Sequence, residues 1–213
     1  MSLPELALQS VYARLAWGLV FAALLVAVMA RRDSTSGWKE GIATALALAL
    51  MWLPGQASPA YWLGLAFQYP SVMLLALCTL SLSHRLWPAR VSARSAPGLA
   101  IVLALGGALL YVDSVGWLNL NLYALGFDAR VAASAVLLLG AAALWALRRE
   151  STRSTGIALL ACVVGFALAR LPSGNLFDAL LDPLLWCWAV WMALSALRRR
   201  LAGAQGRASL PAA

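Results

Sequence analysis

Long hydrophobic runs make up most of the chain, and short polar segments rich in arginine interrupt them. A membrane-crossing α-helix needs about 20 mainly apolar residues. The pattern predicts an all-α polytopic membrane helix bundle with seven transmembrane helices, at about 11–30, 41–54, 70–86, 98–114, 131–147, 155–170 and 180–197. We expect one transmembrane domain over 1–200 and a flexible cytoplasmic tail over 201–213.

The charged residues alternate between successive connections. Thirteen of the sixteen Lys and Arg residues lie in 31–40, 84–97, 148–154 and the segment after 197. Cytoplasmic loops of membrane proteins carry an excess of such residues. We therefore expect the N-terminus outside, the C-terminus in the cytoplasm and the connections at 55–69, 113–130 and 171–183 outside.

The composition supports a membrane location and excludes other classes. Hydrophobic residues make up 63% of the 213 residues and charged ones 11%, against about 45–50% and 25% in soluble domains. The net charge of +8 is explained by the basic loops, so we expect the lipid bilayer and no nucleic acid as a partner. The inner membrane of a bacterium is the expected location.

The three outer connections resemble one another and are themselves largely apolar. Each contains an aromatic residue followed by a polar one, at Phe67-Gln68, Phe127-Asp128 and Phe177-Asp178. The segments that precede them are short for a bilayer. This pattern is consistent with one helix followed by three helical hairpins, whose outer connections are re-entrant or interfacial partial helices. Tilted helices in a locally thinned membrane are the alternative.

Polar residues cluster in these connections, and polar groups at membrane depth usually face the bundle or a cavity. They predict an outward-facing acidic, amide-rich vestibule that binds or translocates a small polar or cationic solute. Asp178 and Asp182 are spaced to share one helix face, and we expect Arg130 or Arg170 to form a salt bridge with one of them. The candidate binding residues are Asp113, Asn119, Asn121, Tyr123, Asp128, Arg130, Arg170, Asn175, Asp178 and Asp182.

No cofactor or metal is expected from the sequence. His84 is the only histidine, and a zinc or haem site needs further ligands. The three cysteines lie in apolar runs without metal-binding spacing, at Cys78, Cys162 and Cys187.

Two other functions remain open. A non-catalytic accessory subunit or assembly factor would pack against a larger membrane complex through Trp186, Trp188 and Trp191, and through small-residue faces such as Gly106-Gly107 and 140–143. An intramembrane aspartyl enzyme would need two of the outer aspartates within hydrogen-bond reach.

A five-residue stretch, Gly174-Asn175-Leu176-Phe177-Asp178, resembles the Gly-Asn-x-x-Asp element of lipoprotein signal peptidases. The resemblance implies that Asp178 is one member of a catalytic dyad, with Asp113 or Asp128 as the other. Ala179 stands where that family has arginine, and the family's second Asn-x-x-Asp element has no match. The chain is therefore assigned to no family.

Overall fold

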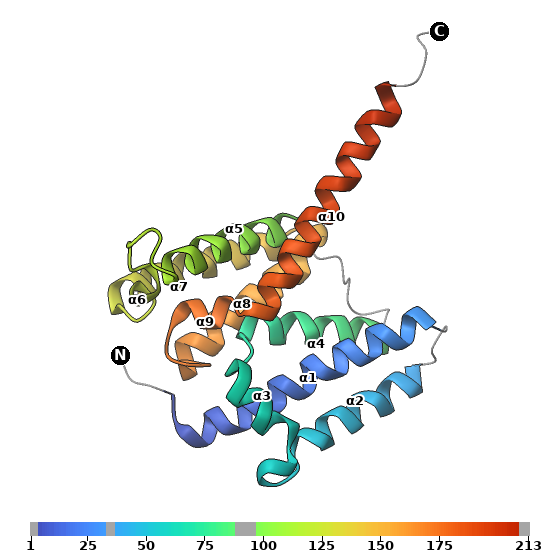
Figure 1. Ribbon diagram of the computed structural model, residues 1–213, viewed down its shortest axis with the longest axis vertical. Helices are drawn as coiled ribbons and strands as arrows, with labels where there is room; N and C mark the ends of the chain where they lie inside the picture. Colours follow the sequence, from blue (N-terminus) through green and yellow to red (C-terminus); the bar gives the residue numbers. More distant parts are fainter. Residues whose placement is uncertain (1–3, 33–36, 88–96, 209–213) are drawn as a thin grey trace.

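Each of the seven predicted apolar segments forms a helix in the computed structural model, which describes residues 4–32, 37–87 and 97–208 (Figure 1). No strand occurs in these ranges. The seven long helices are α1 (Leu6–Arg32), α2 (Gly37–Met51), α4 (Val72–Leu86), α5 (Pro97–Ser114), α7 (Ala129–Leu147), α8 (Arg153–Ala169) and α10 (Pro183–Ala208).

Three of the apolar stretches are long and apolar enough to cross a membrane, which indicates a membrane protein. They are Leu6–Arg31, Ala129–Leu147 and Glu150–Ala169. The third is longer than its sequence pattern predicted, because the 3₁₀ turn Glu150–Thr152 leads directly into α8. Val72–Leu86 and Gly98–Ser114 are apolar but shorter. Seven membrane crossings therefore remain a proposal.

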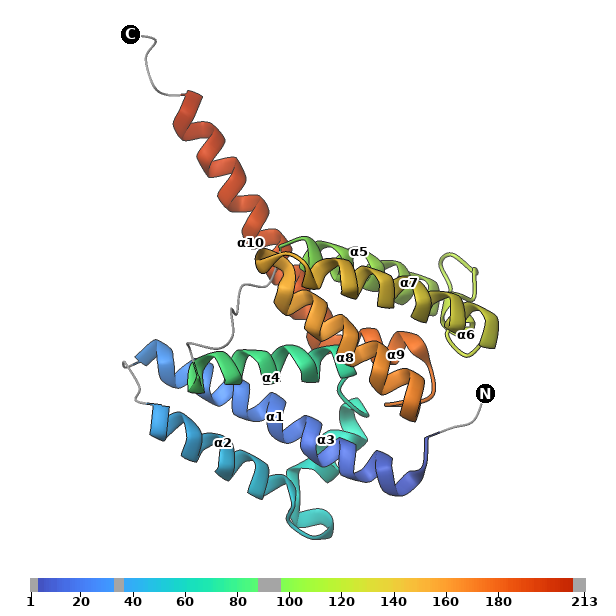
Figure 2. The same cartoon turned by 180° about the vertical axis from the view of Figure 1, so that it is seen from behind.

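The last helix differs most from its prediction. It begins at Pro183 instead of residue 180 and continues to Ala208, through most of the segment predicted to be a flexible tail. The end of that tail, 209–213, lies outside the described residues, as do Arg90 and Arg94 of a predicted inner loop. In both overall views the C-terminal half of α10 extends beyond the other helices (Figures 1 and 2).

Each connection predicted to be outside contains a short helix. These are α3 (Pro59–Phe67), α6 (Leu122–Leu125) and α9 (Leu176–Leu180), and the 3₁₀ turn Gly55–Ala57 precedes α3. The expectation that these connections contain partial helices is confirmed. All three lie at one end of the molecule, called the connection end below (Figures 1 and 2). The opposite end, called the basic end below, holds the end of α1, the start of α2, the end of α4 and the 3₁₀ turn Glu150–Thr152 between α7 and α8 (Figures 1 and 2).

Capping residues determine where several helices begin. Ser71 caps α4 by accepting a hydrogen bond from the backbone N–H of Leu74 at 3.1 Å. Asp128 caps α7, and Asn175 caps α9. Proline is the first residue of α3 and α10, where its missing N–H costs no hydrogen bond.

The long helices do not pack as three hairpins. α1 packs against α2 and α4, α7 packs along α8, and α5 packs along α10. The contact between α4 and α8 joins the two halves of the molecule. The two helices of each expected hairpin are therefore not each other's main partners.

Small residues permit the closest helix contacts. A Cβ atom on Gly156 of α8 would lie 2.8 Å from the carbonyl oxygen of Ala143 in α7. A Cβ on Gly107 of α5 would lie 2.3 Å from the Trp186 ring of α10, whereas Gly106 and Gly140 have open space. Part of the small-residue surface predicted for a partner is thus used within the molecule.

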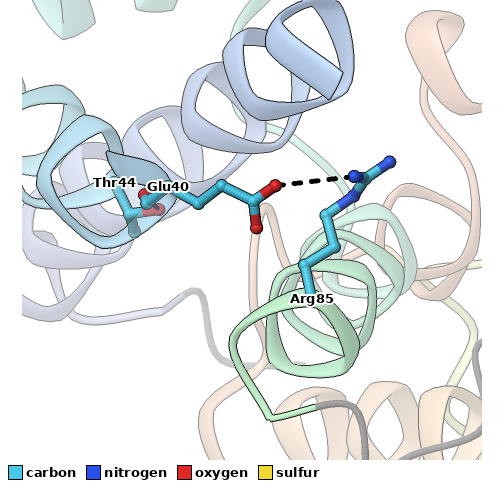
Figure 3. A network of polar contacts seen from close by, with 3 residues as sticks. All are labelled: Glu40, Thr44 and Arg85. Atoms are coloured by element: carbon cyan, nitrogen blue, oxygen red, sulfur yellow. Dashed lines mark hydrogen bonds and ion pairs between the residues drawn. The ribbon is translucent and has the colours of Figure 1, made fainter. Parts of the chain in front are cut away.

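An ion pair between α2 and α4 lies near the basic end. Arg85 Nη1 of α4 lies 3.7 Å from Oε1 of Glu40 in α2, and Glu40 is buried (Figure 3). The hydroxyl of Thr44 donates to the Glu40 backbone carbonyl at 2.8 Å, one turn along the same helix. The ion pair links two helices that otherwise make few contacts.

Candidate binding cavity at the connection end

The three short-helix connections meet around one cavity of about 340 Å³. Residues 66–69 come from the first connection, Ser114 and Tyr123 from the second, and residues between 172 and 183 from the third, while Leu110 and Tyr111 belong to α5. The sequence places these segments far apart, so the fold alone brings them together. The side chains that line the cavity are those of Ala66, Phe67, Gln68, Tyr69, Leu110, Tyr111, Ser114, Tyr123, Pro172, Ser173, Phe177, Asp178, Leu181, Asp182 and Pro183.

Asp178 is the lining carboxylate that keeps an oxygen available. Its Oδ2 accepts hydrogen bonds from the hydroxyl of Tyr123, at 2.8 Å, and from the hydroxyl of Ser173. Its Oδ1 has no hydrogen bond within the described residues, and the side chain is partly exposed. A solute in the cavity can therefore meet a carboxylate oxygen without displacing a protein contact.

Tyr123 acts as a donor to this carboxylate. Desolvation by burial raises the pKa of the Tyr123 hydroxyl above its usual value. The hydrogen bond to Asp178 and the negative charge of Asp178 raise it further. The hydroxyl thus stays protonated at neutral pH, and it holds Asp178 in one orientation.

Asp182 also lines the cavity, but both of its oxygens are engaged by backbone. Oδ2 accepts from the N–H of Ser71 at 2.7 Å, and Oδ1 accepts from the N–H of Leu185 at 2.9 Å. Asp182 is only 7% exposed. It therefore joins the first turns of α4 and α10, where the positive ends of two helix dipoles favour a negative charge.

The expected arrangement of the two aspartates is wrong in two respects. Asp178 belongs to α9 and Asp182 precedes α10, with the extended residue Leu181 between them, so they do not share one helix face. In addition, no ion pair joins either aspartate to Arg130 or Arg170 among the described residues. Hydrogen bonds from neutral donors take the place of the expected arginine.

The two arginines have other surroundings. Arg130 is exposed in the first turn of α7. Arg170 ends α8 in the left-handed conformation, with φ of 53°, and its guanidinium carbon lies 4.9 Å from the centre of the Phe166 ring. Neither side chain lines the cavity.

Asp113 closes the connection between α5 and α7. Its two oxygens accept from the N–H groups of Leu120, at 2.7 Å, and Leu122, at 2.6 Å. Asn119 and Asn121 lie in this loop with φ values of 53° and 55°, a region that asparagine enters more readily than most residues. These three predicted binding residues therefore determine the backbone conformation of this loop.

Asn175 and Asp128 complete the predicted set, and both cap helices. Asn175 is fully buried, accepts from the N–H of Phe177 at 2.8 Å and donates to the Tyr123 carbonyl at 3.0 Å, which joins α9 to α6. Asp128 is exposed and accepts from the N–H groups of Arg130 and Val131. Of the ten predicted residues, the cavity brings together Tyr123, Asp178 and Asp182.

The first connection contributes residues that the site prediction omitted. Gln68 adopts φ of 61°, which is unfavourable for a residue with a side chain. Two residues of α1 hold the adjoining segment, because the Trp17 indole donates to the Gln68 carbonyl at 3.2 Å and the Tyr12 hydroxyl to the Pro70 carbonyl at 2.6 Å. The recurring aromatic-polar pair was the available signal, since Phe67-Gln68 and Phe177-Asp178 both line the cavity.

The tryptophans of the last helix have different surroundings. The Trp186 indole donates to the Ala104 carbonyl at 3.0 Å and packs edge-on against Tyr111. Trp188 packs against the core, whereas Trp191 is 67% exposed. Of the three, only Trp191 offers a large exposed surface.

Comparison with known protein families, curated proteins and solved structures finds no match to this chain.

Proposed function

We propose that this chain is an integral membrane protein of seven crossings that binds or translocates a small polar or cationic solute in the connection-end cavity. The observation that carries the proposal is the free Oδ1 of Asp178 in a cavity formed by three separate connections. Small-molecule sites are concave, mainly apolar and contain a few placed polar groups. The cavity at Asp178 has this character.

The orientation follows from the charges. The described helix ends at the basic end carry Arg31, Lys39, Arg85, Arg148, Arg149 and Arg153. The positive-inside rule therefore assigns that end to the cytoplasm and the cavity to the outside. The 15-residue helices α2 and α4 span roughly 22 Å each, less than the ~30 Å hydrocarbon core. We propose that α3, α6 and α9 complete the outer part of the membrane domain.

The charge selectivity of the cavity tests this function without knowledge of the solute. Ser114 lines the cavity and is exposed, so the thiol of a Ser114→Cys variant can react with reagents that enter the cavity. The three native cysteines are removed in this variant by Cys78→Ala, Cys162→Ser and Cys187→Ser. A unit charge about 6 Å away in water changes a reagent's energy by about 0.7 kcal/mol. This corresponds to a factor of about three for each sign of charge. Asp178→Asn should therefore lower the ratio of cationic to anionic methanethiosulfonate labelling rates about tenfold.

Asp128→Asn is the matched control, because Asp128 is an exposed aspartate that does not line the cavity. It should leave the labelling ratio unchanged. Asp178→Asn should also leave the unfolding temperature nearly unchanged, since an asparagine oxygen still accepts from Tyr123. A ratio that does not respond to Asp178→Asn, or no labelling at position 114, would contradict the proposal.

An accessory subunit is the second candidate function, and one observation favours it. The far half of α10 carries an exposed face formed by Trp191, Leu194, Leu197 and Leu201. Trp191→Ala should leave the charge selectivity of the cavity intact, so the two functions are separable. An aspartyl enzyme is less well supported, because the two residues expected to pair with Asp178 in a dyad are bound to other groups. Both oxygens of Asp113 and the Oδ1 of Asp128 accept hydrogen bonds from backbone N–H groups.

A further inference from the structure

Aromatic residues form much of the cavity wall. They come from all three connections and from the end of α5, so no single helix accounts for them. Among the lining residues there is no lysine or arginine. The aromatic lining residues are Phe67, Tyr69, Tyr111, Tyr123 and Phe177.

Two carboxylates line the cavity, and they differ in the hydrogen bonds they accept. Asp178 leaves Oδ1 without a hydrogen bond among the described residues, whereas Asp182 has both oxygens bound to backbone N–H groups. The guanidinium of Arg170 lies over the Phe166 ring and is not part of the lining. The combination of negative charge with aromatic walls matches a cation that also has apolar surface, because aromatic faces attract cations.

Other charged ligands fit this cavity poorly. Calcium takes six to eight oxygen ligands, and the described residues contain no group of three His, Cys, Asp or Glu side chains that could hold a metal ion. An anion would meet the Asp178 carboxylate without a lysine or arginine in the lining.

We infer that the solute is a small organic ammonium ion, with its charge near Asp178 Oδ1 and its alkyl groups against the aromatic walls. This inference rests on the proposed function and specifies its ligand class. The cavity of about 340 Å³ lies at the lower end of the range for small-molecule sites, about 300–1,000 Å³. A compact quaternary or tertiary amine is thus favoured over a large one.

Choline and 3,3-dimethylbutan-1-ol test the inference, since they have nearly the same shape and differ in charge. The purified full chain in lipid nanodiscs is titrated with each compound, and apparent affinity is read from the rise in unfolding temperature. Cation–π attraction and the carboxylate charge together should make choline bind at least tenfold more tightly than the alcohol. Potassium and magnesium ions, tested alone, should bind more weakly than choline.

Phe67 provides the variant that tests the aromatic wall, because it is 52% exposed and its replacement should not impair folding. Phe67→Leu should weaken choline binding about threefold or more, and Phe67→Tyr should restore it. Phe127→Leu is the control, since Phe127 does not line the cavity. Asp178→Asn should weaken choline binding about tenfold and leave the alcohol unaffected.

The outcomes separate this inference from the proposed function. Equal binding of choline and the alcohol, or tighter binding of magnesium than of choline, overturns the ammonium inference. So does an absence of choline binding. If the charge-selective labelling at position 114 still holds in such a case, the proposed function stands. If that labelling fails as well, both fall.

Discussion

Replacing Asp182 with alanine is expected to lower the free energy of unfolding by about 3–6 kcal/mol, because it removes two hydrogen bonds to a charged group, each worth about 1.5–3 kcal/mol. The change leaves the N–H groups of Ser71 and Leu185 without an acceptor in a buried place, and each such group costs about 1–3 kcal/mol. It also removes the charge that the ends of α4 and α10 favour. Unfolding of the purified protein in mild detergent, followed by helical circular dichroism, measures the effect.

Asp128→Ala is the matched control for Asp182→Ala. Asp128 also caps a helix but is exposed, and loss of such a cap costs about 1 kcal/mol. Asp182→Asn should lie between the two, because one amide oxygen can still accept a hydrogen bond. Equal destabilisation by Asp182→Ala and Asp128→Ala would show that Asp182 does not hold α4 and α10 together.

Asn175→Ala is expected to destabilise the protein by about 2–4 kcal/mol, because it leaves one buried backbone N–H without an acceptor, at about 1–3 kcal/mol, and removes a second hydrogen bond worth about 1 kcal/mol. The N–H is that of Phe177, and the second bond is the one to the Tyr123 carbonyl, which keeps the N–H of Gly126 as a donor; Asn175 is fully buried between them. A Cβ on Gly126 would lie 1.9 Å from Asn175 Oδ1, so this contact is tightly packed. The same unfolding measurement applies.

Asn119→Gly is the contrasting variant. Asn119 lies in an exposed loop with φ of 53°, a conformation that glycine adopts without strain. Its replacement should change the free energy of unfolding by less than about 0.5 kcal/mol. If Asn119→Gly lowered the free energy of unfolding as much as Asn175→Ala, the conclusion that the α6–α9 contact through Asn175 stabilises the fold would be wrong.

The helices themselves were predictable, because apolar runs bounded by polar residues must fold as helices in a lipid environment. The short helices in the connections were also predictable, since their aromatic and leucine residues would otherwise be exposed to water. The packing partners were not. Hydropathy does not encode which helices touch, and contacts such as Gly156 on Ala143 depend on the shapes of both helices.

The break between α9 and α10 had a local sequence signal, which the prediction that Asp178 and Asp182 share one helix face did not use. Asp182 is followed by Pro183, and an aspartate before proline is typical of a helix beginning. The prediction that Asp178 and Asp182 share one helix face did not take the Asp182-Pro183 pair into account. The role of Asp182 as an acceptor for Ser71 depends on residues 111 positions apart, which no local pattern reveals.

The candidate site was predictable as a region and not as a set of residues. Sequence alone located its polar groups at one end of the molecule. It did not separate the residues that shape backbone, such as Asp113 and Asn121, from those that face the cavity, such as Asp178. The distinction depends on which polar atoms the backbone already occupies.

The sidedness of the two ends is the most direct test of the account, because the function proposed here requires the cavity to open outside. In intact cells, a membrane-impermeant sulfonated maleimide should label a single cysteine introduced as Ser114→Cys, at the connection end. It should not label Ser151→Cys, at the basic end, until the cells are permeabilised. Labelling of position 151 in intact cells, or protection of position 114, would contradict the account.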